Sequence, residues 1–436
     1  MQQKQARPRL LQAMVDAFRL PDLRRRILLT IGILVIFRFV AHVPLPGVDP
    51  EALQLLFERN AMLGMLDMFS GGAMRYFSVA AMGVYPYITA SIIMMLLVPV
   101  IPRLQAISRE GETGKNKINR ITHWLTVPMA ALAGYGQLVL LQREGAVSST
   151  TVLSTIAIVL ALTAGTMFCV WLGELITEYG IGNGISIIIF GGIVAGLPEM
   201  VGRSFLAQAN FGGLAIYILI ALATTVLIVI FTEAHRRIPV QYARSVFRGG
   251  RMYKQSGSTH IPLRVNTAGM IPLIFAMSIV IFPSMVASYF ANPAEPNIAN
   301  SIMNLFDPSA ALPMGLFYWG LYFLLVVAFA FFYTMVVFQQ QDLPGTLQRQ
   351  GGFIPGIRPG RLTANYLNQV IKRLTWGGAL FLALVAVMPF LMREITNVQV
   401  IQLSSMGMLI VVGVVLDTMK QLEAQLVMRR YEGFIK

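Results

Sequence analysis

Residues 61–100 read AMLGMLDMFSGGAMRYFSVAAMGVYPYITASIIMMLLVPV, and this stretch decides the fold. Its first part, Ala61–Ser70, is apolar and rich in methionine, ends at Gly71-Gly72, and is too short to cross a bilayer as a helix. Its second part, Ser78–Val100, has about the apolar length that a crossing helix needs, but Pro86 interrupts it. This combination is typical of a half-helix enclosed by protein within the membrane, a plug beside a channel wall. A helix on the outer membrane surface fits the composition equally well.

The composition is that of an integral membrane protein. Hydrophobic residues make up 56% of the 436 residues and charged residues 12%, against about 45–50% and about 25% in soluble domains. The formal charge of +14 is compatible with nucleic acid or anionic lipid partners, so its distribution matters more than its size. Cys169 is the single cysteine, which excludes an intrachain disulfide, and the four histidines lack metal-ligand spacing. We therefore expect neither a metal nor a cofactor.

The N-terminal segment is polar and basic, with an apolar spacing between Leu10 and Phe18 that favours a helix on the membrane surface. The apolar run that follows, Ile27–Val43, resembles the core of a signal peptide. It is long, however, and ends in His42-Val43-Pro44 instead of a small-x-small cleavage site. We interpret residues 1–26 as a cytoplasmic segment and the apolar run as a retained first span.

Apolar runs of membrane-crossing length recur along the whole chain. They predict ten spans, at about Ile27–Val43, Ser78–Val100, Ile121–Leu141, Val152–Leu172, Ile181–Leu197, Gly213–Phe231, Ala268–Phe290, Met314–Phe338, Leu374–Met392 and Met406–Val427. An even number of spans places both ends of the chain on one side. We count 27 Lys and Arg on that side and 5 on the other, with Arg38 inside the first span and Lys420 inside the tenth. Because short loops rich in these bases stay in the cytoplasm, both termini are predicted to be cytoplasmic.

Two of the predicted cytoplasmic loops are long. In Thr232–Thr267, the segments Ile238–Tyr242 and His260–Val265 have strand-like composition on either side of a Gly-rich middle, which predicts a projecting hairpin. Gln339–Arg373 combines a Gly/Pro-rich turn with an amphipathic helix. Loops without function are usually short in helical bundles, so these two segments are predicted to be docking arms.

The motifs that would support enzymatic chemistry are absent or in the wrong context, which predicts that the chain is not an enzyme. The segment Gly111–Lys115 has the wrong spacing for a phosphate-binding loop, and Gly180–Gly184 joins two spans as a tight turn. No Gly-x-Ser-x-Gly elbow and no pair of catalytic carboxylates is visible. Ionisable residues within the spans are few, and Arg38 and Asp417 stand out. Such charges often serve proton relays, but their place near span ends favours snorkelling or pairing with a neighbouring helix.

One feature recurs in the two halves of the chain. The second span of each set of five carries a proline followed by polar residues, Pro86 with Thr89 and Ser91, and Pro272 with Ser278. Interrupted helices at matching positions point to the working site of a pseudo-symmetric membrane protein, although proline kinks are also common in membrane helices. Two such helices facing each other would form a seam that hinges and that these polar residues line.

The fifth span combines branched apolar residues, Ile185–Ile189, with Gly191, Gly192 and Gly196, which permit close helix packing. If spans two, five, seven and ten meet centrally, such residues form a dry collar that blocks ions by dewetting and grips no particular chemical group. A collar of this kind suits a pore with chemically varied cargo. For any one of these residues alone, ordinary bundle packing is the better interpretation.

Five motifs become specific when they are taken together. They are Met68–Ala73 (MFSGGA), Pro86–Ile93 (PYITASII), Trp171–Glu174 (WLGE) with Gly180–Ile189 (GIGNGISIII), Ser258–Asn266 (STHIPLRVN) and Phe353–Gly360 (FIPGIRPG). In this order and at this spacing, the chain resembles the SecY family, the central subunits of bacterial Sec protein-conducting channels. The resemblance implies an all-α polytopic membrane protein with ten transmembrane helices in two pseudo-symmetric five-helix halves around a central pore, closed by a plug half-helix.

The resemblance also implies a division of the chain. The N-terminal half would be residues 27–206 and the C-terminal half 207–427, with docking loops at 232–267 and 339–373 and a cytoplasmic tail at 428–436. A plug at about residues 60–72 would include Met62, Leu63, Met65, Leu66, Met68, Phe69, Gly71 and Gly72. The pore ring would be Val84, Ile88, Ile189, Ile274 and Ile410, with the register at Ile410 left open by a valine-rich run. A lateral gate of spans two and three against spans seven and eight would include Pro86, Thr89, Ser91, Pro272 and Ser278.

By the same resemblance, the chain would be a channel of the bacterial cytoplasmic (inner) membrane that translocates unfolded secretory polypeptides and releases hydrophobic segments laterally. The implied partners are SecE and SecG subunits, the SecA ATPase or the translating ribosome as motor, signal sequences and nascent polypeptides as cargo, and membrane lipids. SecDF and YidC are further candidates, and DNA is not expected.

Docking residues are implied in both long loops. Arg358 matches its motif directly, Arg244 and Arg251 match by loop position, and Arg248 and Arg361 lie beside them. A basic hairpin suits ribosomal RNA phosphates, read by shape and charge, and equally an acidic protein surface.

Two other classes of function are less well supported. A secondary transporter should place polar groups at the midplane, where the predicted collar is apolar. A membrane-embedded enzyme would need a catalytic dyad, which the sequence does not offer. The open or closed state, the bound partner and the oligomeric state are left open by the sequence.

Overall fold

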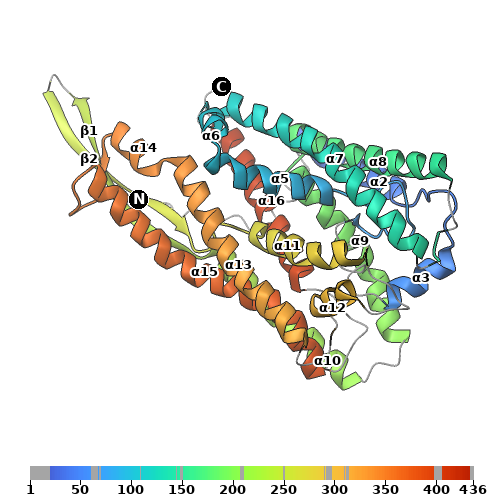
Figure 1. Cartoon of the computed structure of the whole chain (residues 1–436). Coiled ribbons are helices and arrows are strands. Elements are labelled where there is room, and N and C mark those ends of the chain that lie inside the picture. Colours follow the sequence, from blue (N-terminus) through green and yellow to red (C-terminus); the bar gives the residue numbers. More distant parts are fainter. Residues whose placement is uncertain are drawn as a thin grey trace. The chain divides into compact units, whose positions relative to one another are not determined.

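The computed structural model describes residues 20–59, 67, 70–108, 110–143, 145–147, 151–206, 211–248, 251–288, 290, 297–308, 310, 314–396 and 405–432. Within these ranges the regular structure is helical apart from one small sheet. The chain divides into two compact units. The first comprises Met1–Ala209, Ile281–Gly315 and Ile410–Lys436, and the second comprises Asn210–Val280 and Leu316–Leu409. Figure 1 labels the elements.

Each unit has its own set of elements. The first contains α2 (Pro21–Val40), α3 (Pro50–Arg59), α5 (Tyr85–Val100), α6 (Pro102–Ser108), α7 (Glu112–Arg143), α8 (Val152–Tyr179), α9 (Gly184–Leu206) and α12 (Ile298–Leu305). The second contains α10 (Phe211–Glu233), β1 (His235–Arg248), β2 (Arg251–Arg264), α14 (Leu343–Arg349), β3 (Gly352–Phe353), α15 (Arg361–Thr396) and nearly all of α13 (Met314–Gln341). Both α11 (Ile271–Ser288) and α16 (Ser405–Glu432) contribute residues to the two units.

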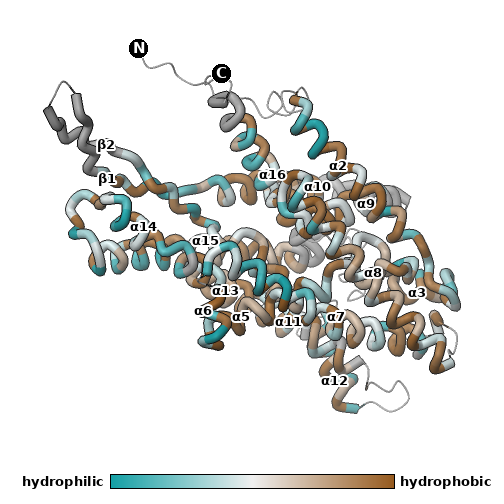
Figure 2. Tube along the Cα trace, turned by 90° about the horizontal axis from the view of Figure 1, so that it is seen from above, coloured by the Kyte–Doolittle hydropathy of each residue, from teal (hydrophilic) through white to brown (hydrophobic). Residues whose placement is uncertain are grey.

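Each of the ten predicted spans overlaps one of these helices. Among the described residues, four stretches are long and apolar enough to cross a membrane, namely Glu112–Gln142, Val152–Tyr179, Gly315–Arg349 and Arg361–Met388. The pair α5 and α6 passes the same test as one broken span, while α9, α10 and α11 contain shorter apolar stretches. Hydrophobic residues follow most of the helices, and hydrophilic residues gather around α6 and α14 (Figure 2). The chain is therefore a largely helical membrane protein, and the count of ten crossings stays a prediction.

The second predicted span begins later than its apolar run. Residues 79–84 form turns and α5 starts at Tyr85, so Pro86 lies in the first turn of the helix instead of breaking it. The prediction of a helix interrupted at Pro86 was wrong, because proline suits a helix start, where no N–H is needed and its fixed φ already fits. The break lies at the other end, where Ile101 is extended and α6 leaves at 102°. Pro272 is likewise the second residue of its helix, α11.

Small residues bring backbones of the first unit together. A Cβ added to Gly165 of α8 would lie 2.7 Å from the carbonyl carbon of Val79. One added to Gly184, at the start of α9, would lie 2.6 Å from the carbonyl carbon of Gly173 in α8. Packing of this kind is how membrane helices gain contact area without larger side chains. The long helices α7 and α8 run side by side (Figure 1).

The second unit contains the predicted hairpin. β1 and β2 pair in antiparallel fashion, with Ile238 opposite Ile261, so this prediction is confirmed. The short strand β3 adds to the other edge of β1, with Gly352 opposite Tyr242. The two predicted docking loops therefore form one sheet. It covers a buried core of Ile238, Val240, Leu263, Leu347, Ile354, Leu367 and Val370.

The predicted amphipathic helix and the ninth predicted span are one continuous helix, α15. Within the second unit α15 packs against α10, where the rings of Phe231 and Phe381 stack with centroids 3.9 Å apart. Its first turns pack on the sheet core through Leu367 and Val370. One helix therefore carries the connection between the sheet and the apolar bundle of this unit.

Candidate functional site

A buried carboxylate organises the end of the predicted plug. We call Asp67 together with residues 70–75 the Asp67 turn. The Oδ1 atom of Asp67 accepts hydrogen bonds from the Ser70 hydroxyl and from the Met74 N–H, both at 3.2 Å, and its Oδ2 atom lies 2.7 Å from Arg75 Nε. The side chain of Asp67 is only 5% exposed. A buried carboxylate with an ion pair and several donors holds a turn firmly, because charge-assisted bonds are strong at low dielectric.

Two glycines give this turn its backbone path. Gly71 and Gly72 have φ values of +68° and +85°, in the left-handed region that glycine enters without a steric penalty. The Gly72 N–H donates to the carbonyl oxygen of Asp67 at 3.1 Å. The Gly-Gly pair in the sequence is thus explained by local geometry, independently of any function.

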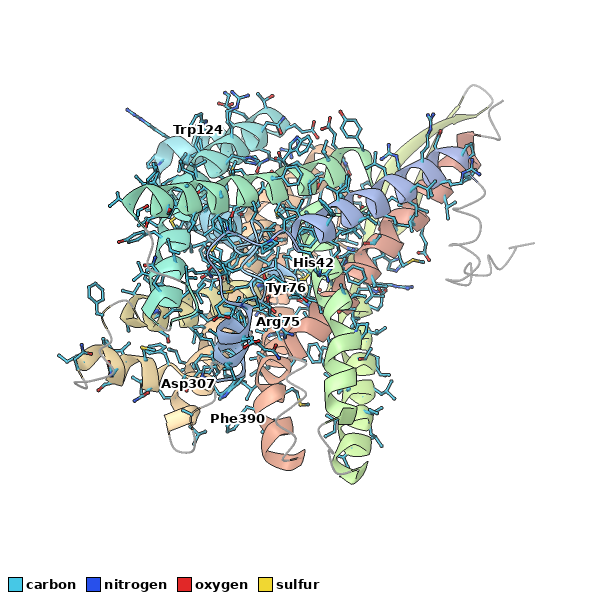
Figure 3. The ribbon with its side chains drawn as sticks, turned by 90° about the vertical axis from the view of Figure 1, so that its right-hand side faces the viewer. His42, Arg75, Tyr76, Trp124, Asp307 and Phe390 are labelled. Atoms are coloured by element: carbon cyan, nitrogen blue, oxygen red, sulfur yellow. The ribbon has the colours of Figure 1, made fainter. Side chains whose placement is uncertain are left out.

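Arg38 of α2 reaches the same turn, where its Nη1 donates a hydrogen bond to the carbonyl oxygen of Gly71. One helical turn further on, His42 Nδ1 lies 2.8 Å from the carbonyl oxygen of Arg38, and its ring lies 4.9 Å from that of Tyr76. Figure 3 shows His42, Arg75 and Tyr76 gathered in one region. The charge noted within the first span therefore binds the backbone of the Asp67 turn.

Gly71 also packs directly on Gly192 of α9. A Cβ added to Gly71 would lie 2.7 Å from Gly192 Cα and 3.2 Å from the ring of Phe37 in α2. Ordinary carbon–carbon contacts are about 3.5–4.0 Å, so only the absence of side chains allows this approach. We call Arg38, Asp67, Gly71, Arg75 and Gly192 the plug anchor. It ties the turn to α2 and to α9.

The structure places only part of the predicted plug. Gly71 and Gly72 lie in the Asp67 turn, whereas Met62, Leu63, Met65, Leu66, Met68 and Phe69 lie outside the described residues. The sequence carries a signal for the anchor that hydropathy alone does not reveal. Asp67 is a lone carboxylate in a Met-rich apolar run, and a base follows it eight residues later.

The predicted ring residues are all buried. They are Val84, Ile88, Ile189, Ile274 and Ile410. Val84 and Ile88 are one turn apart at the start of α5, and the Ile88 N–H donates to the Val84 carbonyl at 3.0 Å. Ile189 in α9 and Ile410 in α16 belong to the first unit, whereas Ile274 in α11 belongs to the second. A closed ring would need both units and stays a prediction.

The predicted gate residues are also divided between the units. They are Pro86, Thr89 and Ser91 in α5, and Pro272 and Ser278 in α11. The Thr89 hydroxyl donates to the Tyr85 carbonyl at 3.1 Å, and the Ser278 hydroxyl donates to the Ile274 carbonyl at 2.9 Å. Each hydroxyl is thus satisfied within its own helix, one turn back. The gate between the two helices stays a prediction.

The predicted docking arginines lie on the sheet of the second unit or directly after it. Arg244 and Arg248 are in β1, and Arg251 is in β2 directly opposite Arg248. Arg358 follows β3, Arg361 begins α15, and both are exposed. Sequence patterns suggested two separate arms, whereas strand pairing between β1 and β3 joins them.

Metal chemistry finds no support in the part of the chain that the structure describes. Among those residues no group of three His, Cys, Asp or Glu side chains comes close enough to hold a metal ion. Cys169 is buried in the middle of α8. Burial without an activating base or cation makes such a thiol inert.

Comparison with known proteins points in one direction. A family model described as SecY matches residues 78–419. The protein translocase subunit SecY of Streptomyces scabiei is 41% identical, over 98% of this chain and 100% of its own length. That of Halalkalibacterium halodurans is 42% identical, over 97% and 99%.

Solved structures share the fold. One described as a protein-conducting channel matches with a TM-score of 0.61 at 16% identity, covering 95% of this chain and 97% of the other. Sec61 from a canine ribosome–channel complex of the endoplasmic reticulum matches with a TM-score of 0.60 at 16% identity and the same coverage. A yeast Ssh1 complex bound to the 80S ribosome matches with a TM-score of 0.59 at 14% identity, covering 93% and 89%.

Proposed function

Since the chain belongs to the SecY family, it is a protein translocation channel. We propose how its residues close the channel, open it and bind its partners. The observation that carries the proposal is the contact of Gly71 with Gly192, reinforced by the hydrogen bond from Arg38. It fixes the end of the predicted plug to two helices of the first unit.

In the proposed closed state, the plug anchor holds the plug at its C-terminal end. Asp67 keeps the turn compact through Arg75, so the turn moves as one piece, and Gly192 offers a flat backbone surface with no side chain to lock it in place. The anchor is therefore specific but weak, since each of its contacts is worth only about 0.5–3 kcal/mol. A plug held in this way stays closed at rest and is released when α2 and α9 shift by a small distance.

The second seal in the proposal is the ring of Val84, Ile88, Ile189, Ile274 and Ile410, all branched and uncharged. A narrow apolar constriction expels water and so blocks ions without a fixed charge. The same surface makes no specific bond with a passing chain. Polypeptides of any composition can therefore move through it, and the branched side chains close around them.

Lateral release follows from solvent preference. A signal sequence is itself an apolar helix, and we propose that it enters between α5 and α11, whose first turns carry Pro86 and Pro272. Hydrophobic segments then leave toward lipid, because each charged residue placed at a membrane centre costs about 2.5–3.5 kcal/mol. Segments that contain such residues continue through the pore.

Docking is proposed on the three-stranded sheet of the second unit. Strand pairing places Arg248 and Arg251 at the end of the hairpin, and two basic residues there suit an anionic partner. Arg358 and Arg361 add exposed charge after β3. Two of the structures with this fold come from ribosome complexes. We propose ribosomal RNA as one partner of this surface and the SecA ATPase as the other, because the sequence shows no nucleotide-binding motif of its own.

The proposed setting is the bacterial cytoplasmic membrane, with both termini in the cytoplasm. SecE and SecG subunits complete the channel, and signal sequences with the nascent chains behind them are its cargo. The basic residues of the loops on the side of the termini support this orientation.

Reconstitution tests the proposal. The chain, purified with its small partner subunits, would be placed in liposomes with SecA, ATP and a secretory precursor. We expect precursor that is protected from added protease, and we expect none when ATP or the signal sequence is missing. A channel that protects a signal-less precursor equally well would contradict the proposed opening step.

A further inference from the structure

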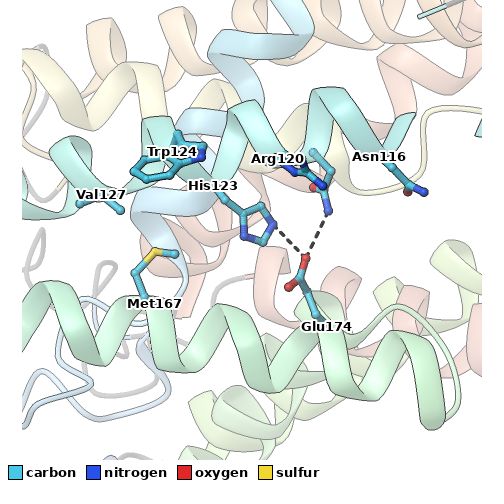
Figure 4. Close-up of a pocket in the computed structure, with 8 residues that line it drawn as sticks. Asn116, Arg120, His123, Trp124, Val127, Met167 and Glu174 are labelled. Atoms are coloured by element: carbon cyan, nitrogen blue, oxygen red, sulfur yellow. Dashed lines mark hydrogen bonds and ion pairs between the residues drawn. The ribbon is translucent and has the colours of Figure 1, made fainter. Parts of the chain in front are cut away.

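A cavity of about 400 Å³ lies between α7 and α8 in the first unit. On α7 it is lined by residues three and four apart, from Asn116 to Val127, which share one face of the helix. On α8 it is lined by Met167 and Glu174. Figure 4 shows the two helices facing each other across it. Neither the pore ring nor the plug anchor contributes to this cavity.

One end of the cavity holds a fixed carboxylate. The Oε1 atom of Glu174 lies 2.9 Å from His123 Nε2 and accepts a hydrogen bond from Asn119 Nδ2 at 3.2 Å. Tyr87 of α5 in turn donates from its hydroxyl to Asn119 Oδ1 at 3.2 Å. The Glu174 side chain is nevertheless 42% exposed, so it is held in one position and still open to the cavity (Figure 4).

A free cation lies at the same end. Arg120 is exposed and lines the cavity one residue away from Asn119. Within the described part of the chain, its guanidinium has no hydrogen bond or ion pair. Because the Glu174 carboxylate forms no ion pair with it, the Arg120 guanidinium is available to bind an anionic group. The forked N–H donors of a guanidinium match the oxygens of a phosphate.

The cavity changes character along α7. Val127 lies seven residues beyond Arg120, about 10 Å along the helix, and together with Met167 it makes that end apolar. Trp124 stands between the two ends and is 75% exposed, while Trp171 of α8 is 52% exposed. Exposed indoles on membrane helices mark the level of the lipid headgroups. Polar groups on the cytoplasmic side and apolar groups beneath them repeat the order of groups in a phospholipid.

We propose that this cavity binds one phospholipid whose zwitterionic headgroup carries a primary ammonium. Arg120 binds the phosphate, Glu174 accepts a hydrogen bond from the ammonium, and one acyl chain lies along Val127 and Met167. A headgroup with phosphate but no amine would leave Glu174 facing a second negative charge, so the site selects against purely anionic lipids. The inference requires that α7 and α8 cross the membrane and is independent of the plug and the ring.

Quenching of Trp124 fluorescence tests the site in the full channel with its partner subunits. Nanodiscs of phosphatidylcholine, whose quaternary ammonium has no N–H to donate to Glu174, would receive increasing amounts of brominated phosphatidylethanolamine or brominated phosphatidylglycerol. The signal of Trp124 would be isolated as the difference from W124F, because the chain has four tryptophans. We expect half-maximal quenching at a mole fraction of the ethanolamine lipid roughly fivefold or more below that of the glycerol lipid, as one added charge-assisted bond predicts.

Three variants separate the contributions of the two charges. Glu174→Gln should remove the preference for the amine lipid, and Arg120→Gln should raise the mole fraction needed for both lipids. Lys115→Gln, at an exposed base on the same helix outside the cavity, should change neither. Equal quenching by the two lipids in the unaltered channel, or an amine preference that survives Glu174→Gln, would overturn the proposal. No quenching of Trp124 by either lipid would also overturn it, since a polypeptide would then occupy the cavity.

Discussion

The substitution Gly192→Ala should make the resting channel leak ions. The added methyl group would meet the Cα of Gly71 well inside van der Waals distance and its amide nitrogen at 3.2 Å. Both are backbone atoms, so no side chain can rotate away to make room. Gly71 is itself held by the bond from Arg38 and by the positive φ of its turn. The contact must therefore open as a whole.

The size of the effect follows from this geometry. The two backbones would have to separate by about 1 Å to restore an ordinary contact distance. Adding one methyl group to a closely packed contact costs about 1–3 kcal/mol. If that free energy falls on the closed state alone, the ratio of closed to open channels drops by about 5- to 150-fold. An additional leak of this size is measurable against a tightly sealed channel.

The assay is the flux of a small ion through liposomes that contain the purified channel and no translocating chain. Gly196→Ala is the matched control, because a Cβ at Gly196 has open space around it on the same helix. We expect Gly192→Ala to leak, Gly196→Ala to stay tight, and both to melt within a few degrees of the unaltered channel. Equal tightness of all three proteins would show that the Gly71–Gly192 contact does not keep the channel closed. A leak from both variants would point to α9 in general instead.

The remaining predictions concern the Asp67 turn and the sheet. Asp67→Ala removes the carboxylate that pairs with Arg75 and accepts hydrogen bonds from backbone N–H groups, so it should raise the same ion flux. The double variant Asp67→Ala with Arg75→Ala should leak less than the sum of the two single variants. Strictly additive leaks would argue against the Asp67–Arg75 ion pair. Arg358→Glu should reduce protease-protected precursor while the protein still inserts into the membrane, and normal secretion would count against docking at this residue. In Gly352→Val, the new Cβ would lie 2.8 Å from the ring of Tyr242, so β3 should detach from β1. Faster amide hydrogen exchange in β3 would reveal the detachment. Unchanged exchange would mean that the strand pairing tolerates the larger side chain.

Much of the fold could be predicted from hydrophobic pattern alone. Each predicted span overlaps a helix because a long apolar run has no other way to satisfy its backbone in lipid. The hairpin was predictable for a related reason, since strand-like segments flank a Gly-rich middle. The start of α5 could not be predicted, because apolar residues continue through the turns before Tyr85. Hydropathy cannot distinguish a buried turn from a helix. Pro86 marked that boundary, but in a membrane helix a proline can also mark a kink.

Contacts between distant segments were beyond the sequence. The pairing of β3 with β1 joins Tyr242 to Gly352, and two residues of strand carry no pattern that would announce it. The cavity between α7 and α8 is similar, because Arg120 and Glu174 each look like ordinary charges near a span end. Only their positions on facing helices give them a shared role. Spacing along one element reports which residues share a face, and it says nothing about what that face meets.

The plug anchor also bears on how such a channel could open without chemical energy of its own. The hydrogen bond from Arg38 ties the Asp67 turn to α2 and the backbone contact at Gly192 ties it to α9, while the Asp67–Arg75 ion pair lies within the turn and moves with it. Transfer of an apolar residue to the membrane centre yields about 0.3–0.6 kcal/mol, so a signal helix with about ten such residues brings about 3–6 kcal/mol. That amount matches a handful of contacts worth about 1 kcal/mol each, and none of these contacts is a hydrogen bond within a helix. A signal helix can therefore release the plug while the fold stays intact, and the motor is left to move the polypeptide.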